Sequence, residues 1–333
     1  MPTHHPGTAV AHSKGDIDLT DAPWALTTHL LAINHQQLLR VTRHPFLERA
    51  AKGTLPKPLI AQWLANDRQY IEGYLSTLKN TLNLIRSTYK STSTSDAEPD
   101  IETRLIAWLE AGIQNGEREI NFFQEVADIY KIDFAPSPLQ ENIKSEGLRR
   151  YEVLFNSVAS QQPNSFLPWL EGAILLWSTE KVYYEAWSWA RRQDTQASPR
   201  SYDNDMDGGA MRREFIPNWS NRDFMMFVEQ LERIINEGVS IAVGRDDKKW
   251  IEVKSRADPI WKALLDAEEA FWPDIPGAEG SLIEPGVQRG QDGDMNATTM
   301  RGTGGGEILN EHQGVRAGDI AGMRNSGHGT VMT

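Results

Sequence analysis

The sequence predicts an all-α protein, a bundle of helices layered around a central cavity. Three observations predict this fold class. Apolar residues recur at helical spacing through most of the chain. No segment shows strand-like alternation, and no Gly-rich phosphate loop stands at a strand–helix junction. All eleven tryptophans lie between Trp24 and Trp272, which suits a large buried interior.

A single helical domain, residues 21–276, is expected to lie between two segments that lack a core. Residues 1–20 are expected to form a flexible arm. Residues 277–333 are expected to form a disordered tail, because 14 of the 26 glycines lie between Gly277 and Gly329 and large apolar residues are scarce there.

The first half of the domain is expected to hold four helices. A helix opens at Pro23 and runs to about Arg43. "HPFLERAAKGTLP" predicts a short helix that Gly53 terminates. The next helix follows "TLPKP", since prolines are tolerated in a first turn, and fades in the polar stretch "STYKSTSTSDAEPD". Periodic apolar residues predict another helix over 100–130, which "DFAPSP" ends.

The second half is expected to hold helices over 143–157, 166–192, about 221–237 and 258–272. A hydrophilic loop, "RQDTQASPRSYDNDMDGGAMRRE", separates the second and third of these. The stretch "VSIAVGRDDKKWIEVKS" is the weakest part of the pattern, and a hairpin-like insert or a loop would both fit it.

Charge and composition narrow the class of function. The formal net charge is −12, and basic residues form only short runs, so no nucleic-acid partner is expected. The absence of cysteine excludes disulfides, thiolate nucleophiles and Cys-ligated metals. No run of 18 uncharged apolar residues is present, so neither a membrane partner nor a location outside the cytoplasm is expected.

Three predicted helices each place one carboxylate on an apolar stripe. Asp67 stands seven residues after Ile60, where the stripe calls for an apolar residue. In the same way, Glu180 stands seven residues after Ala173, and Glu268 stands eight residues after Ile260. Burial of an unpaired carboxylate lowers the free energy of unfolding by roughly several kcal/mol, or the group becomes protonated instead. Such groups therefore usually line polar cavities. The alternative is that each acid lies at the edge of its stripe or pairs with an arginine such as Arg68 or Arg104.

"HPFLERAAKGTLPKPLIAQWLANDRQYIEGY" resembles a signature of the TenA/thiaminase-II family, and "KIDFAPSP", "STEKVYYEAW" and "EEAFW" resemble later family motifs in order. The resemblance spans about Trp24 to Trp272. It implies the haem-oxygenase-like fold, a homo-oligomer (dimer or tetramer), and hydrolysis of an aminomethyl-pyrimidine without a cofactor or metal.

The resemblance also implies roles for individual residues. Asp67 would hold the aminopyrimidine, Tyr70 would support the catalytic helix, Tyr183 would line the pocket, and Glu268 would be the acid–base residue. Chemically, a carboxylate suits the amidine-like edge of an aminopyrimidine, and a buried Glu can carry a proton near neutral pH. Tyr74 and Glu180 are further candidates for substrate binding.

The sequence departs from the family pattern at two positions. Thr179, or Ser178 in a register shifted by one, stands where the family has its nucleophilic cysteine. A hydroxyl needs an adjacent base to act as a nucleophile. Trp219 stands where the family has a pocket tyrosine, which replaces a hydroxyl with an indole.

Histidine is absent from Pro45 to Glu311, which leaves the later core helices without the ligand that a di-iron oxidase needs. His29 or His35 could serve a haem, but an ordinary helical role fits each better, and His44 is expected to cap or pack. Trp177, Tyr184 and Trp187 are expected to pack in the core.

Two functions are therefore expected from the sequence. The first is hydrolysis of a carbon–nitrogen bond in an aminopyrimidine or related small heteroaromatic amine, with carboxylates as acid and base. The alternative is a non-catalytic protein with the same pocket, which binds a ligand in regulation or in a biosynthetic pathway.

Overall fold

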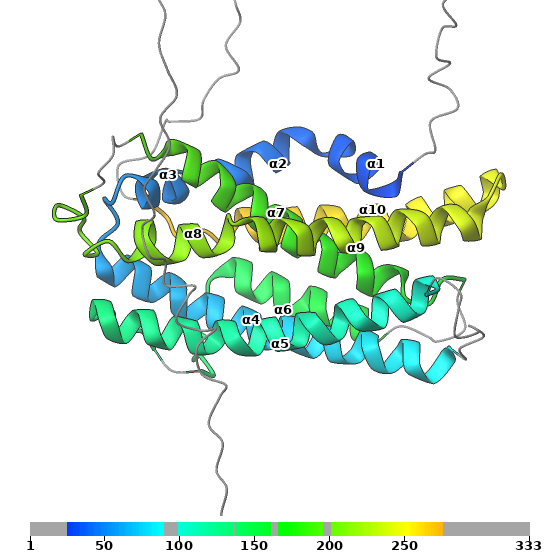
Figure 1. The fold of residues 1–333 in the computed structure, drawn as a ribbon, viewed down its shortest axis with the longest axis horizontal. Helices are drawn as coiled ribbons and strands as arrows, with labels where there is room; N and C mark the ends of the chain where they lie inside the picture. The colour runs from blue at the N-terminus through cyan, green and yellow to red at the C-terminus, as the bar shows by residue number, and fades with distance from the viewer. Residues whose placement is uncertain (1–24, 90–98, 136, 161–165, 196–200, 276–333) are drawn as a thin grey trace, which may run out of the picture. The chain divides into compact units, whose positions relative to one another are not determined.

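The computed structural model describes residues 25–89, 99–135, 137–160, 166–195 and 201–275, and these residues form helices and no strand. The expected arm (1–20) and tail (277–333) lie outside the described residues. The helices, drawn in Figure 1, are α1 (Leu26–Ile33), α2 (His35–Thr42), α3 (Pro45–Ala51), α4 (Lys57–Thr88), α5 (Ile101–Tyr130), α6 (Glu146–Ala159), α7 (Leu170–Gln193), α8 (Ile216–Trp219), α9 (Arg222–Val243) and α10 (Asp247–Glu269). A π-helical turn, Met211–Phe215, leads directly into α8.

Side-chain caps determine where several of these helices begin. Asp100 accepts a hydrogen bond from the backbone N–H of Thr103 (2.9 Å) at the start of α5. Ser145 accepts one from Leu148 N–H (3.0 Å), so α6 begins three residues later than the periodicity predicts. Such caps satisfy backbone donors that have no partner inside the helix.

The helices α4 and α7 carry most of the packing between elements. Helix α4 packs against α5, α6 and α7, while α7 also packs against α2, α3, α9 and α10. In Figure 1, α4 and α5 run along one side of the bundle, α1 to α3 cover the other, and α7 lies between them. The all-α multi-helical bundle expected from the sequence is therefore confirmed.

The core between the helices is rich in aromatic rings. Six tryptophans are completely buried: Trp63, Trp108, Trp169, Trp177, Trp187 and Trp261. Each removes a large apolar surface from water, at roughly 25 cal/mol per Å². Trp177 and Trp187 are thus packing residues, as expected, and Tyr184 packs its half-buried ring on Phe224.

The structure corrects the expected helix boundaries in two places. The single helix expected over residues 23–43 is broken at Asn34, where α1 ends and α2 starts. The segment "VSIAVGRDDKKWIEVKS" is neither a hairpin nor a long loop, because α9 continues to Val243 and α10 already begins at Asp247. Gly244 (φ +58°) terminates α9, and Asp246 caps α10, so a short turn is sufficient.

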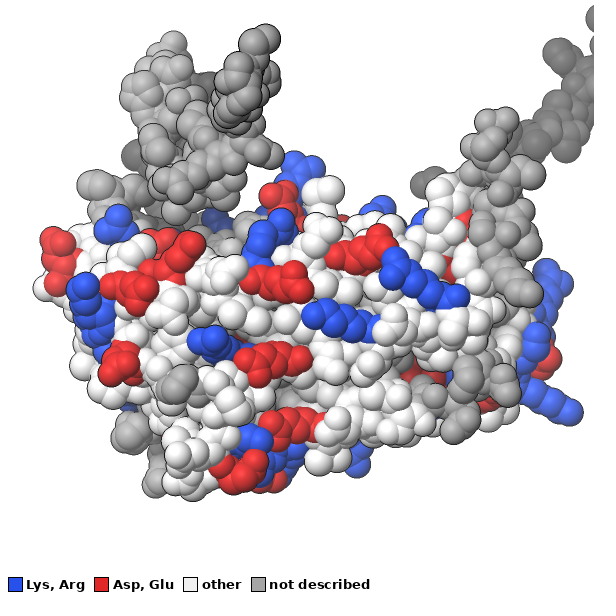
Figure 2. Space-filling model, turned by 90° about the horizontal axis from the view of Figure 1, so that it is seen from below, with Lys and Arg blue, Asp and Glu red and all other residues white. Residues whose placement is uncertain are grey.

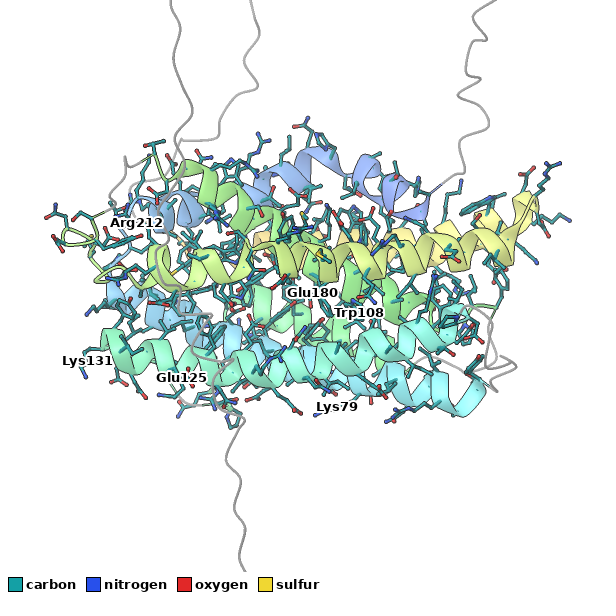
Figure 3. All side chains as sticks on the ribbon, in the orientation of Figure 1. Lys79, Trp108, Glu125, Lys131, Glu180 and Arg212 are labelled. Atoms are coloured by element: carbon teal, nitrogen blue, oxygen red, sulfur yellow. The ribbon has the colours of Figure 1, made fainter. Side chains whose placement is uncertain are left out.

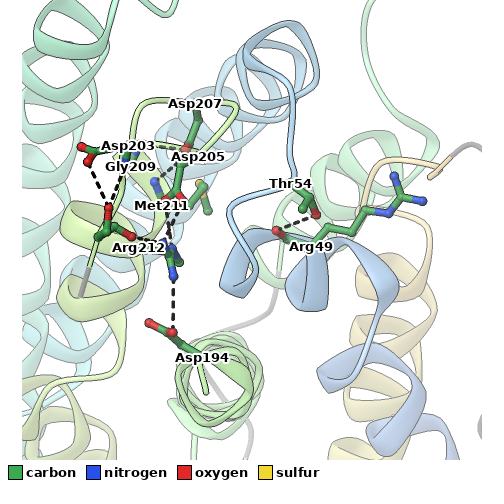
Figure 4. Close-up of polar contacts among 10 residues, drawn as sticks. Arg49, Thr54, Asp194, Asp203, Asp205, Asp207, Gly209, Met211 and Arg212 are labelled. Carbon is green, nitrogen blue, oxygen red and sulfur yellow. Dashed lines mark hydrogen bonds and ion pairs between the residues drawn. The ribbon is translucent and has the colours of Figure 1, made fainter. Parts of the chain in front are cut away.

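A buried ion-pair network fixes the segment that precedes α8 (Figure 4). The Arg212 guanidinium donates to both carboxylate oxygens of Asp205 (2.9 and 2.8 Å), to the carbonyl of Ser201 and to Asp194 (3.4 Å). Met206 N–H donates to the carbonyl of Gly53 (2.9 Å), which joins the segment to the turn between α3 and α4. The network thereby fixes the start of the π-helical turn and α8.

The surface that Figure 2 shows carries acidic and basic side chains close to one another. Exposed ion pairs link α4 to α5, such as Lys79 with Glu117 at 3.6 Å. Isolated pairs of this kind contribute about 0–1 kcal/mol each. The stability of the bundle therefore rests on its core.

Candidate active site

Four carboxylates from four helices meet in the interior of the bundle. Asp67 comes from α4, Glu119 from α5, Glu180 from α7 and Glu268 from α10; Figure 3 labels Glu180 in the middle of the bundle. The negative charges of Glu119 and Glu268 both raise the pKa of Asp67, and the charge of Glu119 raises that of Glu180. The four groups thus form one electrostatically coupled cluster, which we call the carboxylate cluster.

Each member of the carboxylate cluster accepts a hydrogen bond from an aromatic side chain. The Tyr183 hydroxyl donates to Asp67 Oδ2 at 2.9 Å. The remaining donors are Tyr151 to Glu268 Oε2 at 2.5 Å, Tyr74 to Glu180 Oε1, and the Trp219 indole N–H to Glu119 Oε1. Neutral donors can hold a carboxylate in place without neutralising its charge.

Tyr70 lies at the centre of the cluster. Its ring contacts Tyr151 edge to face (centroids 4.8 Å apart) and also packs on Tyr74, Phe155 and Phe271. Burial raises its pKa most, followed by the charges of Glu180 and Glu268. Its hydroxyl is therefore a neutral hydrogen-bonding group at the middle of the site.

Thr179, at the expected nucleophile position, is 3% exposed and lies beside Tyr70. Its own hydroxyl donates to the backbone carbonyl of Leu176 at 2.7 Å, one turn earlier in α7. The proton of Thr179 therefore points at the backbone and not at a carboxylate.

Burial dominates the electrostatics of the cluster. It raises the pKa of Asp67 well above its usual range, that of Glu119 and that of Glu268 to about 7, and that of Glu180 to about 8. Among the described residues, no lysine or arginine forms an ion pair with any of the four. The alternative pairing of Asp67 with Arg104 does not occur, because Arg104 pairs with Glu237 (2.6 Å).

Part of the cluster faces accessible space. Asp67 and Glu268 are 2% and 5% exposed, whereas Glu119, Glu180, Tyr70 and Tyr183 are only half-buried. Glu268 Oε1 is buried and has no hydrogen-bond partner among the described residues. Buried polar groups are normally paired, so this oxygen is available to accept a hydrogen bond from a ligand.

A pocket of about 270 Å³ opens at the carboxyl end of α10. Asn66 and Phe271 line this pocket, and Phe271 also packs on Tyr70, but none of the four carboxylates is among its lining residues.

Helix packing fixes Glu268 relative to α6. Gly147 N–H donates to the carbonyl of Ala270 (3.1 Å), and a Cβ at Gly147 would lie 2.3 Å from the backbone nitrogen of Phe271. Only glycine permits this close approach of the two backbones. It brings Tyr151, one turn further along α6, within reach of Glu268.

The ligand-free protein is expected to lose stability as the pH rises from about 5 to 8. The pKa values of Glu119, Glu180 and Glu268 are higher in the folded state than in the unfolded state, so their stabilising contribution is complete below about pH 4.5. It is lost as the pH rises through about 7 to 8. One pKa unit corresponds to about 1.4 kcal/mol, but Glu119 and Glu180 are only half-buried and solvent screens their charges, so we expect a net loss on the order of 1–3 kcal/mol.

Urea unfolding at pH 5, 6.5 and 8 measures this loss, and Glu180→Gln serves as the comparison. The variant cannot ionise at this position, so its stability should depend less on pH than that of the wild type. A wild-type free energy of unfolding that rises across this range, or equal pH dependence in the two proteins, contradicts the prediction.

The structure places all eight residues singled out in the sequence around this site. They are Asp67, Tyr70, Tyr74, Thr179, Glu180, Tyr183, Trp219 and Glu268. Glu119 and Tyr151 are not predicted from the sequence. Glu119 lies on the buried stripe of α5, after Gly112 and Gly116 and before Phe123. This stripe is hard to recognise in the sequence because two of its members are glycines.

The three described histidines lie outside the carboxylate cluster. His44 caps α3, as expected, by accepting a hydrogen bond from Phe46 N–H (3.2 Å). His29 contacts Asp258 (2.9 Å), and His35 is exposed.

Within the described ranges, no group of three or more His, Asp or Glu side chains is arranged to hold a metal ion. Within the same ranges, no helix has the length and apolar character needed to span a membrane.

Comparison with protein families gives one extended match. The model of the TENA/THI-4/PQQC family matches residues 33–275. Among curated proteins, a "probable bifunctional TENA-E protein" of Glycine max is 22% identical over 231 residues, which are 69% of this chain and 84% of that protein. A "probable transcription factor" of Fusarium pseudograminearum is 26% identical over 241 residues, 65% of this chain. The match covers only 45% of the Fusarium protein.

Solved structures give the same result. A TenA homologue from Pyrococcus furiosus superposes with a TM-score of 0.53 and 25% identity, over 74% of this chain and 97% of that one. A TenA homologue from P. horikoshii superposes with a TM-score of 0.51 over 75% and 99% of the two chains. At 17% identity, the second match supports the fold alone.

Proposed function

This chain belongs to the TENA/THI-4/PQQC family, and we propose that its carboxylate cluster hydrolyses a carbon–nitrogen bond of an aminopyrimidine or related small heteroaromatic amine. The observation that carries the proposal is the cluster itself. Four carboxylates, two of them buried and two half-buried, meet without a cation among the described side chains, and such a site favours a ligand with nitrogen donors or positive charge.

In the proposed complex, Asp67 binds the amidine-like edge of the heteroaromatic ring. Tyr183 orients Asp67 through the 2.9 Å hydrogen bond, and Tyr70 packs beneath the ring. Trp219 lies against Tyr183 (ring centroids 5.2 Å apart) and supplies the adjoining wall. These contacts would hold the reacting carbon in a fixed position, which lowers the entropic part of the barrier.

Glu268 would donate a proton to the departing nitrogen. Burial raises its pKa to about 7, so a large fraction of the side chain carries a proton near neutral pH. Tyr151 fixes the carboxyl group by donating to Oε2, which leaves Oε1 for the substrate. An amine leaves much more readily once it is protonated.

The attacking group in this proposal is water, because the Thr179 hydroxyl is bound to the backbone. The water oxygen forms a bond to carbon, the carbon–nitrogen bond breaks, and Glu268 protonates the nitrogen. Glu180, which Tyr74 holds beside Tyr70 and Thr179, accepts the proton that the water loses. Burial raises the pKa of Glu180 to about 8, so only the fraction that is ionised near neutral pH serves as this base. The products are an alcohol and an amine, and the step requires no cofactor.

Incubation of the purified chain with an aminomethyl-pyrimidine tests the proposal. Release of hydroxymethyl-pyrimidine and ammonia in equal amounts, above the uncatalysed rate, is the expected result. Binding without release would instead support the alternative function, a non-catalytic ligand-binding or regulatory protein. The hydrogen bond of the Thr179 hydroxyl to the backbone favours that alternative.

Thr179→Val is expected to lower kcat/KM by less than about tenfold. Valine has nearly the volume of threonine, and water would still be the nucleophile, so the variant loses only the hydroxyl and its hydrogen bond to the Leu176 carbonyl. The measurement is the rate of hydroxymethyl-pyrimidine release by folded variant and wild type. Loss of more than about a hundredfold would identify Thr179 as the nucleophile.

The wider expectations from the sequence stay predictions. They are a dimer or tetramer, a cytoplasmic location and the absence of a nucleic-acid partner. Size-exclusion chromatography with light scattering would measure the first of these directly.

A further inference from the structure

Glu119 is a second carboxylate at the ring-binding end of the site, and the proposed hydrolysis gives it no role. The Trp219 indole N–H donates to its Oε1, whereas its Oε2 receives no hydrogen bond from a described residue. The side chain is half-buried in the interior of the bundle. One oxygen is thus held firmly while the other is free to meet a ligand.

Glu119 and Asp67 flank the same pair of aromatic side chains. Tyr183 donates its hydroxyl to Asp67, and its ring packs edge to face on Trp219 (centroids 5.2 Å apart, planes at 76°). Trp219 in turn donates to Glu119. After burial, the charge of Glu119 is the largest influence that raises the pKa of Asp67. The two carboxylates therefore face the same small region.

Close packing of α5 on α4 brings Glu119 into this position. A Cβ at Gly116 would lie 2.8 Å from Leu75 Cδ2 of α4, and one at Gly112 would lie 3.1 Å from Leu78 Cδ2. Both glycines precede Glu119 on the buried stripe of α5. The absence of side chains there lets the two helices approach closely, and Asp67 lies on the facing side of α4.

A purely structural role does not account for Glu119. No lysine or arginine of the described residues pairs with it, and a second carboxylate beside Asp67 makes burial of both more costly. An apolar side chain would fill this place at lower cost. A second observation also indicates a ligand: Glu268, 5% exposed and coupled to Asp67, leaves Oε1 buried without a partner.

We propose that Asp67 and Glu119 together bind the heteroaromatic amine as a cation, with its ring nitrogen protonated, so that the site selects bases over neutral rings of the same shape. The inference rests on the proposed function for where the ligand binds, but it does not require that the ligand is hydrolysed. A neutral aminopyrimidine edge offers one donor and one acceptor, whereas the ionised carboxylates, which a bound cation favours, only accept. Protonation converts the ring nitrogen into a donor and adds an attractive charge.

Isothermal titration of the full chain with two probes tests this inference. One probe is 4-aminopyrimidine, and the other is 4-pyrimidinone, which has a similar shape but a much less basic ring. The wild type is expected to prefer the amine by at least tenfold in Kd. Glu119→Gln, which keeps the size of the side chain and removes its charge, is expected to reduce this preference at least tenfold.

Glu125→Gln is the matched control, since Glu125 lies on the same helix and is exposed (Figure 3). Its preference should equal that of the wild type. Glu119→Gln should also melt no lower than the wild type, because it removes a half-buried negative charge that has no cationic partner among the described residues and can still accept the hydrogen bond from Trp219. An undiminished preference in Glu119→Gln, a loss of its fold, or a wild type without preference overturns the inference. A preserved preference for the amine together with an absence of hydrolysis overturns only the proposed function.

Discussion

Replacement of Glu268 by Gln is expected to lower kcat for hydrolysis between about a hundredfold and ten-thousandfold, the range typical for loss of a general acid. Glutamine keeps the shape of the side chain and can still accept the hydrogen bond from Tyr151, but it cannot donate a proton of comparable acidity. KM should change little, because Asp67 binds the ring. The measurement is steady-state release of hydroxymethyl-pyrimidine by both proteins.

The pH dependence of kcat distinguishes proton donation from a merely structural role of Glu268. Burial raises the pKa of Glu268 to about 7, so the protonated form that the step needs is lost as the pH rises through that value. The wild-type kcat should therefore fall on the alkaline side, and the residual activity of Glu268→Gln should lack this limb. A structural defect would lower kcat at every pH alike.

Glu269→Gln is the control for this experiment. The side chain is exposed, it is adjacent in sequence, and it forms a surface ion pair with Arg40 at 2.7 Å. Its loss should leave hydrolysis within about threefold of the wild type. Release by Glu268→Gln at the wild-type rate would show that another group protonates the leaving nitrogen.

The positions of Asp67 and Glu268 were predictable from the sequence because helical periodicity is a local property. Each acid interrupts an apolar stripe, and both are buried, as the stripe requires. Glu119 obeys the same rule on α5. Its stripe is hard to recognise in the sequence because Gly112 and Gly116 contribute no apolar side chain. In the structure, these two glycines lie where α5 packs closely on α4.

The boundary between α9 and α10 was not predictable from local sequence. The run around Val239, Ile241 and Val243 is β-branched, which disfavours helix intrinsically. Burial of Val239 and Val243 on one face of α9 outweighs that preference. The hydrogen bond of the Thr179 hydroxyl to the backbone was also not predictable, because the sequence does not specify which rotamer a threonine adopts.

Replacement of Arg212 by Met is expected to lower the free energy of unfolding by about 3–5 kcal/mol, the typical cost of breaking a buried ion pair. The side chains of Arg212, Asp205 and Asp194 are 4%, 5% and 7% exposed. Methionine fills much of the same space but removes the Arg212 guanidinium from both carboxylates. Urea unfolding of wild type and variant at pH 7 measures the difference.

Arg213→Met provides the comparison, because Arg213 is exposed and lies over the Tyr202 ring at 5.2 Å. It should cost less than about 1 kcal/mol, as for an exposed cation–π contact. Equal losses in Arg212→Met and Arg213→Met would show that the Asp205 and Asp194 contacts contribute nothing net. Since Arg212 fixes the segment that leads into α8, its loss should also release Trp219 from Glu119. The preference of Arg212→Met for 4-aminopyrimidine over 4-pyrimidinone should then fall together with its stability.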